Sequence, residues 1–321
     1  MSGERATPIH PDYAAFFEKT RNHLRPSSGL ITPQEYRENL DKAASLISLP
    51  KVIEKEMTIT YNNIEVKIIL FRPPESKDDE LLPILIYYHG GGFVFGSRHS
   101  HSKAVRQICV ENDISVMFVD YSLAPEHKYP TAHEECYAAF AWVLERGKDI
   151  HVDTSKIAVC GDSAGGSLAA AIPIMAKERG IQKDVIKAQI LIYPWLSPSA
   201  EAFQSYHEFG NGNYPLSLKD MVYYDKVYFT QENKDKFSHP LLATVDELQY
   251  LPPALVLTAE ADVLRDEGEA YARKLTEAGV PTASVRLIGA VHTYFSSALD
   301  TPVYKQTLNM IKYQLSEAFK K

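Results

Sequence analysis

Cysteine is scarce in this sequence of 321 residues. Only Cys109, Cys136 and Cys160 occur, an odd number without C-x-x-C spacing, and no Asn-x-Ser/Thr acceptor for N-glycosylation is present. This pattern gives no support to a disulfide framework of the kind found in secreted proteins. It fits a reducing compartment, and we expect a cytoplasmic protein.

Long hydrophobic runs and an excess of positive charge are missing as well. No stretch reaches the ~18 consecutive apolar residues of a membrane span. The N-terminal region carries charges such as Glu4, Arg5 and Asp12 in place of an apolar signal block. Lys and Arg number 34 against 41 Asp and Glu, a net charge of -7, so no general basic field attracts nucleic acid. We expect no nucleic-acid partner, membrane span or secretory signal.

The remaining composition is that of an ordinary globular protein. Hydrophobic residues make up 45% and charged residues 23%, with 16 Gly and 19 Pro, which argues against disordered, collagen-like and coiled-coil chains. The length suits one α/β domain with an added lobe, so residues 1–321 are expected to form a single domain.

Short apolar runs alternate with longer amphipathic segments along most of the chain. The runs, mostly continuous, have the composition of strands buried on both faces of a parallel sheet: 84–88, 116–119, 157–160, 189–193, 255–258 and 284–288. Helical patterns lie at about 102–112, 133–146, 164–179, 267–279 and 303–319. Residues 52–60 and 64–72 alternate in twos and predict an edge hairpin. The order of elements predicts a doubly wound α/β sheet with βαβ crossovers.

Two segments lie outside this alternation. Residues 1–48 contain helical stretches around Tyr13–Arg21 and Pro33–Ser48, and residues 197–240 are rich in aromatic side chains. We expect a cap built from about 1–48 and 197–240; the alternative is that both only cover sheet edges. The aromatic side chains of the second segment could line a pocket or form plain core: Tyr214, Tyr223, Tyr224, Tyr228 and Phe229.

A nucleophile motif follows the strand predicted at 157–160. The segment 161–166 reads GDSAGG, a Gly-x-Ser-x-Gly pattern between a strand and an Ala-rich helix. Such a sharp turn strains the serine and presses the flanking residues against neighbouring backbone, so glycine suits Gly161 and Gly165. Ser163 is thereby predicted at the carboxyl end of the sheet and at a helix N-terminus, where developing negative charge is favoured.

A second glycine cluster, HGGGF at 89–93, follows the first of the apolar runs. When a serine attacks a carbonyl group, the oxygen needs preorganised N–H donors, and glycines let the backbone approach it. We predict that the amides of Gly91, Gly92 and Ala164 form this oxyanion hole. The phosphate-binding patterns G-x-G-x-x-G and G-x-x-x-x-G-K-[ST] are not matched, and His89 is expected to hold the loop by hydrogen bonds.

In hydrolases with this turn the partners of the serine follow in the order serine, acid, histidine. Only His207, His239 and His292 come after Ser163. The first two lie in the aromatic segment, whereas His292 directly follows the last predicted strand. His292 is therefore the predicted general base.

The acid should lie in the loop after the strand predicted at 255–258, where three carboxylates compete. Glu260 is too close to the end of the strand, and Asp266 is expected to cap the following helix. Asp262 is therefore the predicted acid. It would hold the imidazole of His292 in its productive tautomer while that ring takes the proton of Ser163.

Other histidines give no metal-binding pattern. His133 could open an H-E-x-x-H motif, but position 137 is a tyrosine. His99 and His101 stand two apart without neighbouring carboxylates or cysteines, so we expect them to face solvent at the start of a helix.

Together these residues resemble the hormone-sensitive-lipase-like branch of the α/β-hydrolases, mostly carboxylesterases. Four segments carry the resemblance over nearly the whole chain: 89–93 (HGGGF), 120–126 (DYSLAPE), 161–166 (GDSAGG), and the surroundings of Asp262 and His292. The resemblance implies an eight-stranded α/β-hydrolase sheet, a helical cap and hydrolysis of small-molecule esters with short to medium acyl chains. It implies no metal or organic cofactor, and homodimers through the last strand are common in such enzymes.

The chain departs from the pattern of that family in two loops. Ser122 replaces the usual arginine of the 120–126 motif, which removes an expected ion pair, and Val263 replaces the proline that commonly follows the acid. Two alternative functions remain open. An amidase or deacetylase would use the same three residues, and gibberellin receptors share the fold without turnover because their histidine is replaced, whereas His292 is retained here.

Overall fold

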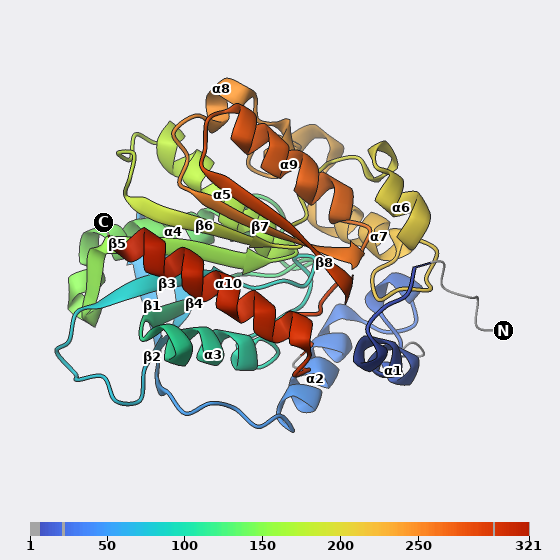
Figure 1. The fold of residues 1–321 in the computed structure, drawn as a ribbon, viewed down its shortest axis with the longest axis horizontal. Coiled ribbons are helices and arrows are strands. Elements are labelled where there is room, and N and C mark those ends of the chain that lie inside the picture. Colours follow the sequence, from blue (N-terminus) through green and yellow to red (C-terminus); the bar gives the residue numbers. More distant parts are fainter. Residues whose placement is uncertain (1–6, 21–22, 298, 321) are drawn as a thin grey trace.

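The computed structural model describes residues 7–20, 23–297 and 299–320. An eight-stranded sheet runs through it in the order β1-β2-β4-β3-β5-β6-β7-β8 (Figure 1). The strands are β1 Ile53–Tyr61, β2 Ile64–Arg72, β3 Leu82–Tyr88, β4 Ser115–Asp120, β5 Val152–Asp162, β6 Ile186–Ile192, β7 Ala254–Ala261 and β8 Thr282–Val291. The predicted strands are confirmed, with ends that differ from the prediction by at most five residues.

The two edges of the sheet are built differently. β1 pairs with β2, and β2 with β4, in antiparallel fashion, whereas every pairing from β4 through β3, β5, β6 and β7 to β8 is parallel. Asn62 and Asn63 join β1 to β2 with φ of 47° and 65°, the left-handed pair that a tight hairpin needs. In the central strand β5, residues 157–160 are fully buried, because helices cover both faces.

Helices lie in two layers on the sheet. α3 and α10 contact each other on one face, and α4, α5 and α9 pack on the other (Figure 1). The helix bounds are α1 Pro11–Thr20, α2 Pro33–Ala44, α3 Ser102–Asn112, α4 Thr131–Arg146, α5 Ala164–Glu178, α6 Gln204–Phe209, α7 Leu218–Tyr228, α8 Val245–Leu248, α9 Arg265–Glu277 and α10 Pro302–Phe319. The predicted doubly wound α/β-hydrolase architecture is confirmed. The helix predicted around residues 13–21 ends at Thr20, and Arg21 lies outside the described residues.

The segment before β1 and the α6–α7 part of the insertion between β6 and β7 meet at the end of the sheet toward which the parallel strands point (Figure 1). Asp220, near the start of α7, joins them. Its buried carboxylate accepts hydrogen bonds from Arg25 (3.0 Å) and Ser27, while it also caps α7 with Ser217. Tyr214 of the insertion donates a hydrogen bond to the carbonyl oxygen of Thr7 (3.3 Å).

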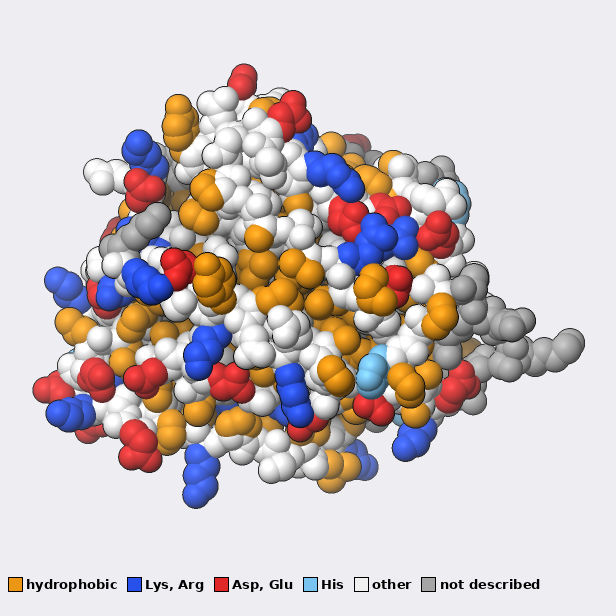
Figure 2. All heavy atoms as spheres, viewed as in Figure 1, with side chains coloured by type: hydrophobic (Ala, Val, Ile, Leu, Met, Phe, Trp, Pro, Cys, Tyr) orange, Lys and Arg blue, Asp and Glu red, His pale blue; other side chains and the backbone are white. Residues whose placement is uncertain are grey.

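The face of the molecule in Figure 2 carries acidic and basic side chains interspersed, in keeping with the modest net charge of -7. No helix within the described part of the chain is long and apolar enough to cross a lipid bilayer.

Candidate active site

The turn between β5 and α5 places Ser163 at the carboxyl end of the sheet. Ser163 has φ 56° and ψ −119°, a strained conformation for a residue with a side chain. Backbone hydrogen bonds hold it on both sides: its N–H donates to Ile192 (2.9 Å), and its carbonyl oxygen accepts from Trp195 (3.1 Å). A Cβ atom at Gly165 would lie 2.0 Å from the carbonyl oxygen of Tyr88, so only glycine fits there.

Asp262 and His292 follow neighbouring strands at matching positions, because Ala261 of β7 pairs with Val291 of β8. Ser163 Oγ lies 3.0 Å from His292 Nε2, and His292 Nδ1 lies 2.8 Å from Asp262 Oδ2. The other carboxylate oxygen of Asp262 accepts the N–H of Leu264 at 3.1 Å. The structure therefore brings together the three residues predicted from chain order.

The three side chains lie in a nearly closed site. Their exposed fractions are 8% for Ser163, 4% for His292 and 1% for Asp262. A carboxylate beside Nδ1 accepts the proton on that nitrogen, so Nε2 presents its lone pair to the Ser163 hydroxyl.

The loop after β3, residues 89–97, is called the oxyanion loop below. It passes through three successive left-handed conformations, with φ of 124° at Gly91, 60° at Gly92 and 61° at Phe93. The amides of Gly91, Gly92 and Ala164 donate no hydrogen bond to any residue that the structure describes. A Cβ atom at Gly92 would lie 2.6 Å from the ring of Tyr224 in α7, so the insertion covers this loop directly.

His89 anchors the start of the oxyanion loop as a neutral side chain. Its ring stacks on Tyr121 with centroids 4.1 Å apart, and its Nδ1 donates to the carbonyl oxygen of Gly90 at 2.8 Å. Burial lowers the pKa of His89 to about 3. Its predicted structural role agrees with these contacts.

Asp162, next to the serine, ties the oxyanion loop to the turn. Its Oδ1 accepts from the N–H of Gly90 (3.0 Å) and the hydroxyl of Tyr87 (2.8 Å). Burial alone would raise the pKa of Asp162, but His101, together with the hydroxyl of Tyr87, holds that pKa below its ordinary value. The carboxylate thus stays charged within the core.

Comparison with known proteins identifies the family. A family model described as the α/β hydrolase fold matches residues 85–296. The chain belongs to the α/β-hydrolase family. This hydrolase is 32% identical to an arylesterase of Saccharolobus solfataricus over 294 residues, covering 89% of this chain and 91% of the relative. It is also 32% identical to ethyl acetate hydrolase of Pseudomonas putida over 300 residues, covering 89% and 92%.

A solved structure agrees with these relatives. One of two fungal esterases from Rhizomucor miehei superposes on this hydrolase with a TM-score of 0.93 and 43% identity, covering 98% of both chains. The resemblance to hormone-sensitive-lipase-like enzymes is confirmed. The protein is an enzyme, a carboxylic ester hydrolase. These relatives favour the enzyme over the alternative of a receptor without turnover.

Two side chains of the hydrolase lie elsewhere than their sequence indicated. His101 is buried, not solvent-facing, and its Nε2 lies 3.3 Å from Asp162 Oδ1. Asp266 does not cap α9, which begins at Arg265; its carboxylate accepts from the backbone of Ser205 at 2.8 Å. A loop that folds back against the sheet buried the histidine, and no local signal in the sequence indicates such a return. His99 is exposed, as predicted.

The aromatic residues of the insertion pack around Phe93 in the oxyanion loop. Tyr228 stacks on Phe93 with centroids 4.1 Å apart, and Phe229 meets it edge to face at 5.7 Å. Both insertion residues are almost fully buried. Their burial makes these two rings part of the core, in contact with the oxyanion loop, and a pocket lined by the aromatic side chains of this segment stays a prediction.

At both positions where the chain departs from the family pattern, Ser122 and Val263, other hydrogen bonds restrain the loop. Ser122 donates from both its N–H and its Oγ to Glu135, each at 2.6 Å. The carbonyl oxygen of Val263 accepts the hydroxyl of Ser205 in the insertion at 2.6 Å. A hydrogen bond from α6 thus restrains the acid loop where a proline would have stiffened it.

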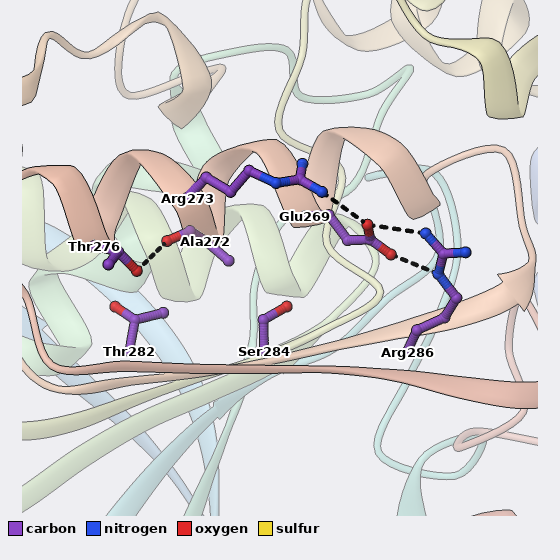
Figure 3. Close-up of a pocket in the computed structure, with 7 residues that line it drawn as sticks. All are labelled: Glu269, Ala272, Arg273, Thr276, Thr282, Ser284 and Arg286. Atoms are coloured by element: carbon purple, nitrogen blue, oxygen red, sulfur yellow. Dashed lines mark hydrogen bonds and ion pairs between the residues drawn. The ribbon is translucent and has the colours of Figure 1, made fainter.

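A surface groove lies between α9 and β8, with a volume of about 380 Å³ (Figure 3). Its lining is polar and includes Arg286, which is paired with Glu269 at 2.7 Å. None of the residues of the oxyanion loop and none of Ser163, Asp262 and His292 line it. The groove is therefore separate from the site at Ser163. Among the described residues, no group of three or more His, Cys, Asp or Glu side chains is arranged to hold a metal ion.

Proposed function

We propose that this esterase hydrolyses short- to medium-chain carboxylic esters through an acyl-enzyme on Ser163, with His292 as general base and Asp262 as its partner. The observation that carries the proposal is the continuous hydrogen-bonded chain from Ser163 Oγ to His292 (3.0 Å) and on to Asp262 (2.8 Å). The first distance permits proton transfer from Ser163 Oγ to His292, and the second lets Asp262 orient the ring.

In the first half of the reaction, Ser163 Oγ attacks the carbonyl carbon of the ester and His292 Nε2 takes the hydroxyl proton. Asp262 stabilises the resulting imidazolium. The tetrahedral intermediate then collapses, the bond to the alcohol oxygen breaks, and His292 gives its proton to that oxygen. The alcohol leaves and the acyl group stays on Ser163.

In the second half, water replaces the alcohol. His292 takes one proton from the water while the water oxygen attacks the acyl carbon. His292 then returns this proton to Ser163 Oγ as the carboxylic acid is released. In both halves the negative oxygen would accept hydrogen bonds from the amides of Gly91, Gly92 and Ala164, which have no other described acceptor.

A small substrate is supported by the covering of the site. We infer that residues 1–48 and 197–240 act together as a cap, because Asp220 joins them and Tyr224 presses on Gly92. Only 8% of Ser163 is exposed beneath them. The name of the ethyl acetate hydrolase relative points to the same size class.

The location and assembly of the enzyme are part of the proposal. A reducing, cytoplasmic environment is supported by Cys109, Cys136 and Cys160, which are buried and unpaired. A homodimer through β8 is supported by its position at the sheet edge, where Ile288 is 69% exposed. Sedimentation velocity tests the dimer, and a monomer at all micromolar concentrations would contradict it.

Hydrolysis of p-nitrophenyl butyrate tests the assignment of the nucleophile. Ser163→Ala is expected to lower kcat by about 10⁵- to 10⁶-fold, as loss of such a nucleophile does elsewhere. Ser167→Ala, one turn further along α5 and also buried, is the matched control and should keep nearly full activity. Turnover that survives in Ser163→Ala would overturn the mechanism.

A series of p-nitrophenyl esters with acyl chains from two to twelve carbons tests the substrate class. We expect kcat/KM to be highest for short to medium chains and to fall for the longest ones, because the covered site limits the acyl group. A maximum at twelve carbons would contradict this part of the proposal.

A further inference from the structure

One arginine of the N-terminal segment contacts the oxyanion loop through its backbone. Arg37, one turn into α2, donates from Nε to the carbonyl oxygen of Val94 at 2.7 Å. Its Nη2 donates to the carbonyl oxygen of Ala124, also at 2.7 Å. The guanidinium therefore joins the oxyanion loop to the 120–126 segment.

The same guanidinium forms a two-pronged ion pair with the carboxylate of Glu126. Nη1 lies 3.0 Å from Oε1 and Nη2 lies 2.8 Å from Oε2. The hydrogen bond from Arg37 lowers the pKa of Glu126. Glu126 is half-exposed, so this ion pair by itself stabilises the fold little. It instead orients the guanidinium so that two of its three remaining N–H groups meet the backbone carbonyls.

The oxyanion loop needs support from outside because its own conformation is strained. Gly91, Gly92 and Phe93 are all left-handed, a conformation that strains a residue with a side chain such as Phe93. Phe93 accepts the N–H of Ala124 at 2.8 Å. Together with Arg37, this bond closes a ring of contacts that includes the peptide between Phe93 and Val94.

α2 is itself fixed with respect to the loop. Thr32 and Glu35 form a reciprocal capping box that sets the start of the helix. Tyr36 then packs edge to face on Phe95 with centroids 5.0 Å apart, and Asp41 accepts the hydroxyl of Ser97. Two successive turns of α2 thus contact the second half of the oxyanion loop.

We propose that Arg37 is a positioning residue for the oxyanion hole, through which the N-terminal segment sets the direction of the Gly91 and Gly92 amides. The proposal rests on the proposed function, because it presumes that these amides receive the oxyanion. Arg37 takes no part in bond making. Arg37 holds the carbonyl of Val94, two residues after Gly92. The amides of Gly91 and Gly92 are therefore already oriented before the substrate binds, which stabilises the transition state more than the bound ester.

The test separates binding from turnover. Arg37→Met, which keeps the length of the side chain but none of its donors, should lower kcat about 10- to 100-fold and change KM less than about twofold. A trifluoromethyl ketone, which forms a tetrahedral adduct with the serine, should bind more weakly by a similar factor. Arg37→Lys should recover only part of kcat, since an ammonium group cannot reach both carbonyls and Glu126 in the same geometry.

Two variants serve as controls. Arg286→Met removes another two-pronged arginine–carboxylate pair, with Glu269 in the groove of Figure 3, and should leave kcat within about twofold. Glu126→Gln keeps both carbonyl contacts of Arg37 and should cost less than about fivefold.

The proposal is overturned if Arg37→Met keeps kcat within twofold, if the loss is in KM alone, or if Arg286→Met loses as much activity. If Arg37→Met does not fold, Arg37→Lys decides by the same division between kcat and KM. The proposed function fails separately, when Ser163→Ala remains active or the wild-type enzyme hydrolyses no ester.

Discussion

The turn that carries Ser163 and the oxyanion loop lie side by side, yet they are supported in different ways. The turn is held from within the sheet, by backbone bonds to Ile192 and Trp195. The oxyanion loop is also held from outside the sheet, by Arg37 of α2 and the ring of Tyr224 in α7. One half of the site therefore depends on the fold of the sheet, and the other half on segments far away in the chain.

The largest expected effect concerns the acid, which like Ser163 belongs to the sheet-supported half. Asp262→Asn preserves the shape but offers an N–H where Nδ1 of His292 needs an acceptor, so the ring takes the wrong tautomer. We expect kcat to fall about 10⁴-fold. Steady-state kinetics with the folded variant measures this, and a loss below tenfold would remove Asp262 from the mechanism.

A pair of glycine substitutions compares the two supports directly. A Cβ atom at Gly165 meets the rigid carbonyl of Tyr88 at 2.0 Å, whereas one at Gly92 meets the side chain of Tyr224 at 2.6 Å. Gly165→Ala should lower the free energy of unfolding by about 3 kcal/mol. Gly92→Ala should lower it less but reduce kcat about 100-fold. Urea unfolding measures the stability of both variants, and steady-state kinetics measures kcat. Equal losses of stability in the two variants would contradict the difference between the two supports.

The pH dependence of stability should originate in three buried histidines. Burial lowers the pKa of His89, His133 and His239 to about 3 each, from an ordinary value of 6.5. Between these values the unfolded chain binds protons that the native protein does not, so stability is full above pH 6.5 and falls as the pH drops. At pH 5 each histidine should contribute a loss of about 2 kcal/mol.

His133→Gln tests this origin, since glutamine does not titrate. The ring of His133 lies 5.5 Å from that of Phe93 in the oxyanion loop. Urea unfolding at pH 7 and pH 5 should show a difference between the two pH values that is about 2 kcal/mol smaller in the variant. An unchanged difference would place the acid sensitivity elsewhere.

The smallest expected effect concerns the link from α6 to the acid loop. Ser205→Ala removes the hydroxyl that Val263 accepts at 2.6 Å and should lower the free energy of unfolding by about 1 kcal/mol. Ser155→Ala, which removes an exposed serine hydroxyl hydrogen-bonded to Asp153, is the control. If Ser155→Ala lowers the free energy of unfolding as much as Ser205→Ala does, the hydrogen bond from α6 does not stabilise the acid loop in particular.

Prediction from the sequence succeeded where short-range patterns carry the structure. The apolar run at 157–160 and the glycines around Ser163 indicated the strand, the turn and the helix, because each depends on neighbouring residues. His101 shows the limit of such patterns: without carboxylates or cysteines near it in the sequence it was expected in solvent, yet the return of the loop past β3 buries it beside Asp162. Asp266 was misplaced for a related reason, since α9 begins two residues earlier than the capping rule indicated.

The sequence by itself determined the doubly wound sheet and the order in which Ser163, Asp262 and His292 occur, because hydrophobic periodicity and turn chemistry are local properties. Only the tertiary structure decided what supports the oxyanion loop. Arg37 precedes that loop by about fifty residues and belongs to no motif, and its role arises from the packing of α2 against Val94 and Ala124. Contacts between distant segments depend on how the whole chain closes on itself, which no single stretch of sequence encodes.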